Sequence, residues 1–236
     1  MNPQDEQKLS KANELREAEK FGDSSKEYTE SLITLIDKQD YSGLIHCLGG
    51  QSLIYKILSR KDSAQIYRNL TIAFAKEAIS VLEQHQEQID PHAQSIALSS
   101  YADALLMDNK PQEALPYFEK SLSISPAPDP EKGRLKCHIG TVKYLLGDKQ
   151  QGFELVQEGL AMIRTGDMND YAVRVWETGA LNNLARYYAL EKDLQKAKEI
   201  IGESLKIATE HNLSIRKREA EDIIQKLADN RTDFSL

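Results

Sequence analysis

Apolar residues recur at three- and four-residue spacing along almost the whole chain, and alternating β-branched runs and hairpin dipeptides such as Asn-Gly are absent from the sequence. This periodicity predicts amphipathic α-helices and no β-sheet. Short polar segments interrupt the pattern and divide the chain into about eleven helices. These breaks are expected at residues 22–23, 38–40, 60–62, 90–91, 109–111, 125–130, 147–148, 166–167, 192–193 and 211–212.

Several breaks contain residues that begin or end helices. Asp90 and Asp129 each precede a proline, which places a capping carboxylate before a proline at the first helical position. Gly147 can adopt the left-handed conformation that ends a helix, and Asp148 can cap the next helix. A connection this short makes the two helices fold back as an antiparallel hairpin. Because nothing interrupts the periodicity of residues 63–88, that segment is expected to form one helix longer than its neighbours.

The order of small and large residues in the window 95–126 resembles the tetratricopeptide repeat (TPR). The residues that carry this resemblance are Leu98, Tyr101, Ala102, Leu105, Ala114, Phe118 and Pro126. Small residues let two helix backbones approach closely, and the large ones fill the space between successive hairpins. The windows 139–156 and 181–201 keep the same order. Their spacing exceeds the family's usual repeat of about 34 residues, which is similar to the long-helix arrays of kinesin light chains and transcription activators, particularly in the string Ala180–Ala185.

The resemblance implies an all-α fold in which antiparallel helical hairpins stack into a right-handed TPR-like superhelix, an α-solenoid. Residues 1–40 are expected to form N-terminal helices that cap or extend the array, and residues 41–90 a degenerate helical hairpin. Residues 91–210 are expected to form three TPR-like repeats. Residues 211–236 are expected to form a C-terminal capping helix and tail, because a terminal repeat needs a polar outer face.

Composition narrows the range of partners. The 236 residues carry a net charge of −7, which gives no cationic field for nucleic acid and disfavours anionic membranes. The polar start of the chain lacks the features of a secretory signal, and no segment approaches the roughly 20 apolar residues of a membrane span. We therefore expect a cytoplasmic protein that binds neither nucleic acid nor membranes. Cys47 and Cys137 are expected to be small buried hydrophobic residues in a reducing compartment.

The sequence contains no recognisable catalytic constellation, phosphate-binding loop or set of spaced metal ligands. His46 with Cys47, and Cys137 with His138, are adjacent pairs. Neighbours on a helix point about 100° apart and cannot both face one metal ion. We therefore expect no metal site, no cofactor and no enzymatic activity.

A superhelix of hairpins lines its inner surface with the first helix of each hairpin, so the resemblance implies a groove that binds a protein or peptide. Positions that line the groove in the family correspond here to Ser99, Ser100, Asp103, Arg134, His138, Thr141, Asn182, Asn183 and Arg186. Asn183 matches the place from which related arrays hydrogen-bond a ligand backbone, and an amide can donate and accept at once. Arg134 and Arg186 can each hold a carboxylate bidentately. Asn183 and Arg186 are expected at the centre of the groove, because residues three apart on a helix lie close together.

Three interpretations of function follow from these patterns. The first is an adaptor or scaffold whose groove holds a protein or peptide. The second is a peptide-responsive regulator, or a modulator of a signalling enzyme, similar to bacterial pheromone receptors, although residues 1–40 hold too few basic side chains for a DNA-reading helix-turn-helix. The third is a helical enzyme with an unrecognised site. The polar groove positions can also be interpreted as ordinary solvated surface, and homo-oligomerisation is compatible with all three functions.

Overall fold

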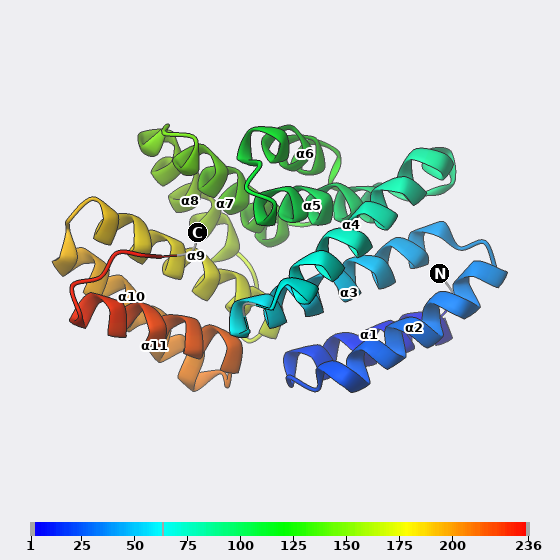
Figure 1. Cartoon of the computed structure of the whole chain (residues 1–236), viewed down its shortest axis with the longest axis horizontal. Coiled ribbons are helices and arrows are strands. Elements are labelled where there is room, and N and C mark those ends of the chain that lie inside the picture. The colour runs from blue at the N-terminus through cyan, green and yellow to red at the C-terminus, as the bar shows by residue number, and fades with distance from the viewer. Residues whose placement is uncertain (1–2, 63, 235–236) are drawn as a thin grey trace. The chain divides into compact units, whose positions relative to one another are not determined.

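The computed structural model describes residues 3–62 and 64–234, and all regular structure in this part of the chain is helical (Figure 1). The predicted all-α fold is therefore confirmed. Eleven α-helices follow one another in the described residues, and a short 3-10 helix, Gln86–Gln88, extends the fourth. The helices are α1 Pro3–Glu17, α2 Phe21–Asp37, α3 Tyr41–Lys61, α4 Gln65–His85, α5 Pro91–Met107, α6 Pro111–Ile124, α7 Asp129–Leu145, α8 Lys149–Ile163, α9 Tyr171–Leu190, α10 Leu194–Glu210 and α11 Ser214–Ala228.

Most connections follow the chemistry that the sequence predicts. Asp90 accepts a hydrogen bond from the backbone N–H of Ala93 at 2.9 Å, and Pro91 is the first residue of α5. Gly147 has a φ of 97°, the left-handed conformation expected of a residue that ends a helix. Asp148 then accepts a hydrogen bond from the backbone of Gln151 and so caps α8. The hairpin predicted at this turn is confirmed.

Two predicted helix boundaries are wrong. Asp129 does not cap α7 but is its first residue, and the preceding Pro128 provides no side-chain hydrogen bond. The break expected at residues 22–23 lies inside α2, because the chain turns earlier, at Glu19 with a φ of 58°. In both places the turn begins one to four residues before the residue whose type suggested it.

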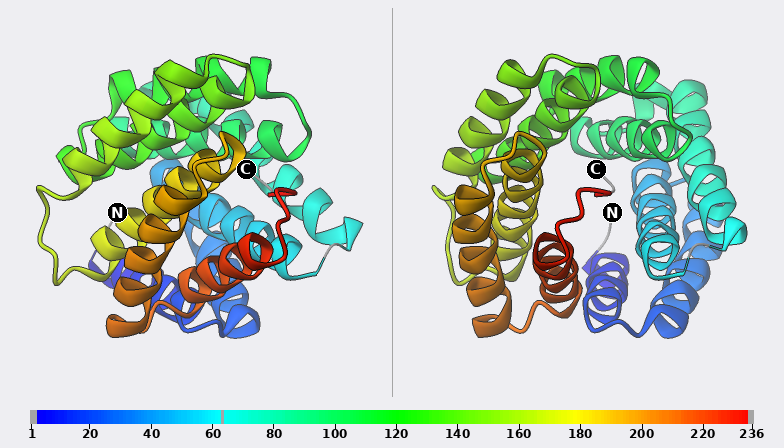
Figure 2. Two further views of the ribbon diagram at one scale, coloured as in Figure 1. Left: turned by 90° about the vertical axis from the view of Figure 1, so that its left-hand side faces the viewer. Right: turned by 60° about the vertical axis from the view of Figure 1, so that its left-hand side comes forward.

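The chain divides into two compact units, Met1–Pro126 (unit 1) and Ala127–Leu236 (unit 2), at the proline-containing connection after α6. Unit 1 contains the hairpins α1–α2, α3–α4 and α5–α6, and unit 2 contains α7–α8 and α9–α10 followed by α11. Figure 2 shows the consecutive packing of α9 (yellow), α10 (orange) and α11 (red). The division falls within the predicted array 91–210, after its first hairpin.

In both units the first helix of each hairpin packs against the first helix of the next one, as expected when hairpins stack. In unit 1, α3 packs against α1 and α5, and in unit 2, α9 packs against α7 and α11. This is the layering of an α-solenoid, in which each hairpin contacts only its neighbours. The residues that the TPR pattern places at close contacts are buried as predicted, because Ala102, Ala114 and Phe118 have no exposed surface.

Four glycines bring α7 and α8 unusually close together. A Cβ atom added at Gly159 would come within 2.5 Å of the backbone oxygen of Gly133, and one added at Gly140 within 2.8 Å of the backbone oxygen of Gly152. Each helix places its two glycines seven residues apart, so both lie on the same face of that helix. The resulting contact of backbone on backbone fixes the position of α7 in unit 2.

Candidate functional site

The nine residues predicted to line a groove lie in different units. Ser99, Ser100 and Asp103 lie on α5 of unit 1, and the other six lie on α7 and α9 of unit 2. In unit 1, Asp103 forms an ion pair of 2.7 Å with Lys56 on α3. The Ser99 hydroxyl is nearly buried and donates a hydrogen bond to the backbone oxygen of Ile96 at 3.2 Å. These contacts serve the packing of unit 1, and the binding role of its three residues stays a prediction.

In unit 2, a network of side chains joins α7 to α9. The Asn183 amide donates a hydrogen bond to the hydroxyl of Thr141 at 3.1 Å, and Tyr187 donates to the same oxygen at 2.9 Å. Arg186 donates to the carbonyl oxygen of the Asn183 side chain at 2.9 Å. The predicted proximity of Asn183 and Arg186 is therefore confirmed. Because its oxygen and nitrogen are held from opposite sides, the Asn183 amide has a fixed orientation.

Asn182 occupies a different environment from its neighbour. Its side chain is only 1% exposed and faces α10 and α11. Ser204 donates a hydrogen bond to its carbonyl oxygen at 2.6 Å, and its amide nitrogen donates to Glu219 at 3.4 Å. Asn182 was predicted to line the groove, but its side chain is buried because α11 covers the side of α9 on which it lies. Asn182 instead ties the last three helices together.

A half-buried stripe runs along α9 between its contacts with α7 and α11. Its members are Trp176, Gly179, Asn183 and Arg186. From α7, the Arg134 guanidinium lies over the Trp176 ring at 5.9 Å from its centre, and from α11 the Arg216 guanidinium lies over Gly179. We call this surface the α7–α9–α11 face. It comprises Arg134, His138, Trp176, Gly179, Asn183, Arg186, Arg216 and Glu219, all of them half-buried.

Sequence reasoning missed Arg216 and Glu219 because α11 was interpreted only as a capping helix. The signal that could have found them is Gly179, a glycine inside a helix about one turn before the predicted groove residue Asn183. A glycine there implies that something from a neighbouring element approaches the backbone closely. In the structure that approaching group is Arg216, which also forms an ion pair of 2.7 Å with Glu219.

The two cysteines are buried, as predicted, one in each unit. Burial raises the pKa of both thiols to about 12. A buried neutral thiol is a poor nucleophile, because the thiolate is the reactive form. Cys47 and Cys137 are therefore packing residues in the structure.

We expect neither thiol to react with iodoacetamide in the folded protein at pH 8, and both to react after unfolding in guanidinium, as counted by mass spectrometry. Because the folded state raises these pKa values, the contribution of the neutral thiols to stability is complete below pH 9.0, the ordinary thiol value, and is lost as the pH rises toward about 12. Rapid alkylation of either cysteine in the native protein would contradict the burial that causes both effects.

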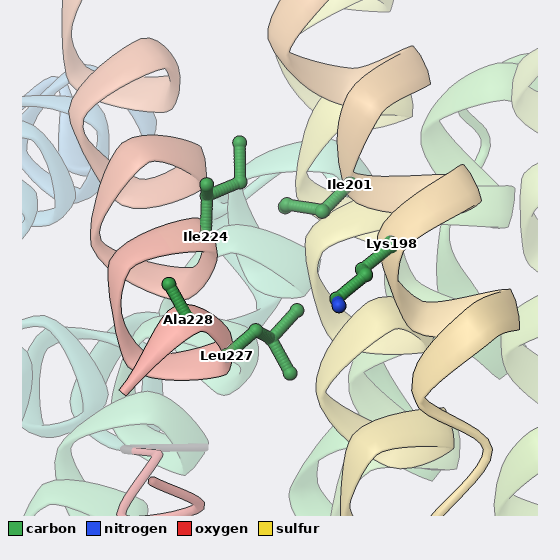
Figure 3. A pocket seen from close by; sticks show the side chains of 5 residues that line it. All are labelled: Lys198, Ile201, Ile224, Leu227 and Ala228. Carbon is green, nitrogen blue, oxygen red and sulfur yellow. The ribbon is translucent and has the colours of Figure 1, made fainter. Parts of the chain in front are cut away.

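The described residues of unit 2 line two open pockets among others. One, of about 270 Å³ between α10 and α11, is apolar apart from Lys198 (Figure 3). The other, of about 350 Å³, lies between α8, α9 and α10. Within residues 3–62 and 64–234, no three His, Cys, Asp or Glu side chains come together to hold a metal ion. None of the described helices combines the length and the apolar character needed to cross a membrane.

Comparisons with known proteins bear on the fold. The model of the family described as the SusR N-terminal TPR domain matches residues 51–222. The crystal structure of BtubC (BKLC) from P. vanneervenii is similar, with a TM-score of 0.54, 14% sequence identity, and 94% of this chain and 93% of that chain covered. A putative kinesin light chain of TPR-like repeats from Podosopora anserina gives a TM-score of 0.47 at 14% identity, with 75% and 95% covered. No curated protein matches the sequence.

Proposed function

Because the chain belongs to the family of the SusR N-terminal TPR domain, we propose that it is a protein-interaction module that binds a peptide or protein segment on its α7–α9–α11 face. TPR proteins generally act as scaffolds that hold other proteins through stacked hairpins. In this role the chain works as an adaptor. The cytoplasmic location expected from the sequence stays a prediction.

The observation that carries the proposal is the orientation of the Asn183 amide. A side-chain amide has two N–H donors and a carbonyl oxygen with two lone pairs. Thr141 takes one N–H and Arg186 fills one lone pair. Among the described residues, this leaves one donor and one acceptor for the backbone of a bound segment, which needs both. The network sets the direction of these groups before a ligand arrives, so binding does not have to order them.

The rest of the face supplies groups suited to side chains of a ligand. Trp176 offers an aromatic surface with the amphipathic character common at binding interfaces, and Arg134 lies across it. Aromatic residues and arginines dominate the binding energy of protein interfaces, whereas serine and threonine contribute little. On these grounds the face of unit 2 is a better candidate than the α5 surface of unit 1, where Asp103 is already neutralised by Lys56.

We expect Asn183→Ala and Arg186→Ala each to weaken binding of a ligand by about 1–3 kcal/mol, since each leaves a desolvated polar partner unpaired. Peptides selected from a random display library on the immobilised chain provide the ligand, and calorimetric titration provides the affinity. The matched controls, Gln195→Ala and Lys206→Ala, remove an amide and a cation from the exposed side of α10 and should leave affinity unchanged. Equal affinities for wild type and both face variants would place the binding site elsewhere.

A further inference from the structure

We propose that the groove between α10 and α11 binds an amphipathic helix of a partner protein, and that this helix packs on α11 as the second helix of a hairpin. The residues that line this groove are different from those of the α7–α9–α11 face. The inference therefore goes beyond the proposed function and does not depend on it. A chain with both sites could hold two partners at once.

The first argument is the position of α11 in the array. It packs against α9 and α10, as α9 packs against α7 and α8, so α11 takes the place of a first helix. Each of the five earlier first helices packs against the second helix that follows it, whereas no helix follows α11 in the described part of the chain. A helix bound beside α10 and α11 would complete a sixth hairpin.

The second argument is the apolar surface of the groove. Ile224, Leu227 and Ala228 of α11 point toward Ile201 of α10, and together these side chains line the pocket of about 270 Å³ (Figure 3). An apolar cavity of about 150 Å³ can hold a benzene ring. The pocket is therefore large enough for one leucine or phenylalanine side chain of a bound helix. Such a side chain would displace water that the apolar walls hold poorly, which favours binding.

The third argument is a pattern that the second helices of this chain share. Four of the five bury an apolar residue with a small residue four positions before it and another three positions after it. The sets are Ser24, Tyr28 and Ser31 in α2, Ala114, Phe118 and Ser121 in α6, Gly152, Val156 and Gly159 in α8, and Ala197, Ile201 and Ser204 in α10. The small residues let the backbones approach, and the larger one fills the space between helices. A helix that packs on α11 in the same way should carry the same spacing.

This pattern also distinguishes a partner protein from a second copy of the chain. The last helix, α11, buries Ala220, Ile223 and Leu227, which do not have the spacing of a second helix. The second helices that do have it already bury these residues within their own hairpins. We therefore assign the groove to a helix of a different protein.

The fourth argument is charge. Lys198 is the polar residue that lines the pocket, and it forms no ion pair with any residue in the described part of the chain. A helix seated in the groove would cover this ammonium group, and burial of an unpaired charge costs free energy. An Asp or Glu of the bound helix, about one turn from its large apolar residue, would offset that cost. The pair would also fix the direction in which the helix lies.

The test uses helical peptides of the length of α10, selected on the full chain from a display library in which one helix face is randomised. Fluorescence anisotropy of the labelled peptides gives their affinities. We expect the selected peptides to share one large apolar residue, small residues four positions before it and three positions after it, and an Asp or Glu close by. A library that yields no helical binder would overturn the inference.

Ala228→Gln tests the pocket, because it extends a polar side chain from an exposed position into the apolar space. We expect it to weaken binding by roughly tenfold or more. Ala161→Gln is the matched control, since it makes the same change at an exposed alanine that lines the pocket beside α8. It should leave the affinity unchanged. If melting curves show that Ala228→Gln unfolds, replacement of the large apolar residue of the peptide by alanine makes the same test on the wild-type chain.

Lys198→Glu tests the charge, and we expect it to weaken binding by roughly fivefold or more. A peptide whose acid is replaced by lysine should bind this variant better than the original peptide does. Lys196→Glu reverses a charge on the side of α10 that faces α8, and it should have no such effect. Peptides that bind equally well to wild type and Lys198→Glu would overturn the assignment of an acidic helix.

The remaining outcomes separate this site from the other surfaces. Peptides that respond to Asn183→Ala but not to Ala228→Gln would place the binding site on the α7–α9–α11 face and overturn the inference, leaving the proposed function standing. Self-association of the chain alone, measured by light scattering and abolished by Ala228→Gln, would assign the groove to a second copy and overturn the proposed occupant. Helical binding that responds to Ala228→Gln and not to Asn183→Ala would support the inference.

Discussion

Gly159→Ala is expected to destabilise unit 2 by about 3 kcal/mol, near the upper end of what overpacking costs. The added methyl group would lie 2.5 Å from the backbone oxygen of Gly133 and 2.6 Å from the Cys137 sulfur. A flexible side chain can move away from such a contact, but a helix backbone cannot do so without moving the whole helix. The measurement is the free energy of unfolding in urea, followed by circular dichroism.

Gly202→Ala is the matched control for this prediction. Gly202 lies in the interior of α10 in the same unit, and an added Cβ atom would meet nothing within 4 Å. Since alanine favours the helix over glycine, this variant should gain about 0.5–1 kcal/mol. A loss of unfolding free energy for Gly159→Ala together with a gain for Gly202→Ala would establish that the close contact between α7 and α8 causes the loss. A similar gain of unfolding free energy in both variants would mean that α7 and α8 are not closely packed.

The arrangement of glycines on α7 and α8 bears on the candidate site. Arg134, His138 and Thr141 lie on α7, and their distance from α9 depends on how closely α7 is held by α8. Thr141 bonds both Asn183 and Tyr187, so a shift of α7 by even one ångström would break the network that orients the Asn183 amide. Gly159→Ala should therefore also weaken peptide binding, although Gly159 lies outside the face.

The sequence predicted the helices and hairpins well, because each depends on local rules. The three- and four-residue periodicity determines the helices, and residues such as Asp90 and Gly147 determine where they begin and end. A break was expected at residues 192–193, but the left-handed conformation of Lys192, like that of Glu19, was not predictable from the residue type. Their φ values are 58° and 67°, yet neither residue type favours that conformation.

The candidate site was predictable only in part, for a related reason. The proximity of Asn183 and Arg186 follows from helix geometry alone, and it is present. The orientation of Asn182 depends on which helix covers α9, and nothing in the residues of α9 identifies that helix as α11. The contact of Arg216 with Gly179 joins residues far apart in the sequence. No local pattern in the sequence connects the two residues, so a single sequence does not reveal such a pair.

Glu177→Ala is expected to destabilise the protein by about 3 kcal/mol, because it removes the buried carboxylate that lies between Arg164 and Arg174 near the start of α9. The Glu177 side chain is 3% exposed, and its two oxygens accept hydrogen bonds of 2.8 Å from Arg164 and Arg174. Without the carboxylate, these guanidiniums would repel each other at the edge of a packed region. Removal of one partner from a buried ion pair costs more stability than the pair itself contributes, since the charge that remains is poorly solvated.

Glu203→Ala provides the comparison, because it removes a different partner of the same arginine. Glu203 pairs with Arg164 at 2.5 Å, but its side chain is 47% exposed, so water can replace it, and the expected loss is under about 1 kcal/mol. Urea unfolding of both variants gives the two free energies. Hydrogen exchange should also quicken in the connection between α8 and α9 for Glu177→Ala alone, since Arg174 also donates to the backbone oxygen of Met168 there. Equal losses of stability in the two variants would show that burial of Glu177 does not determine the strength of this network.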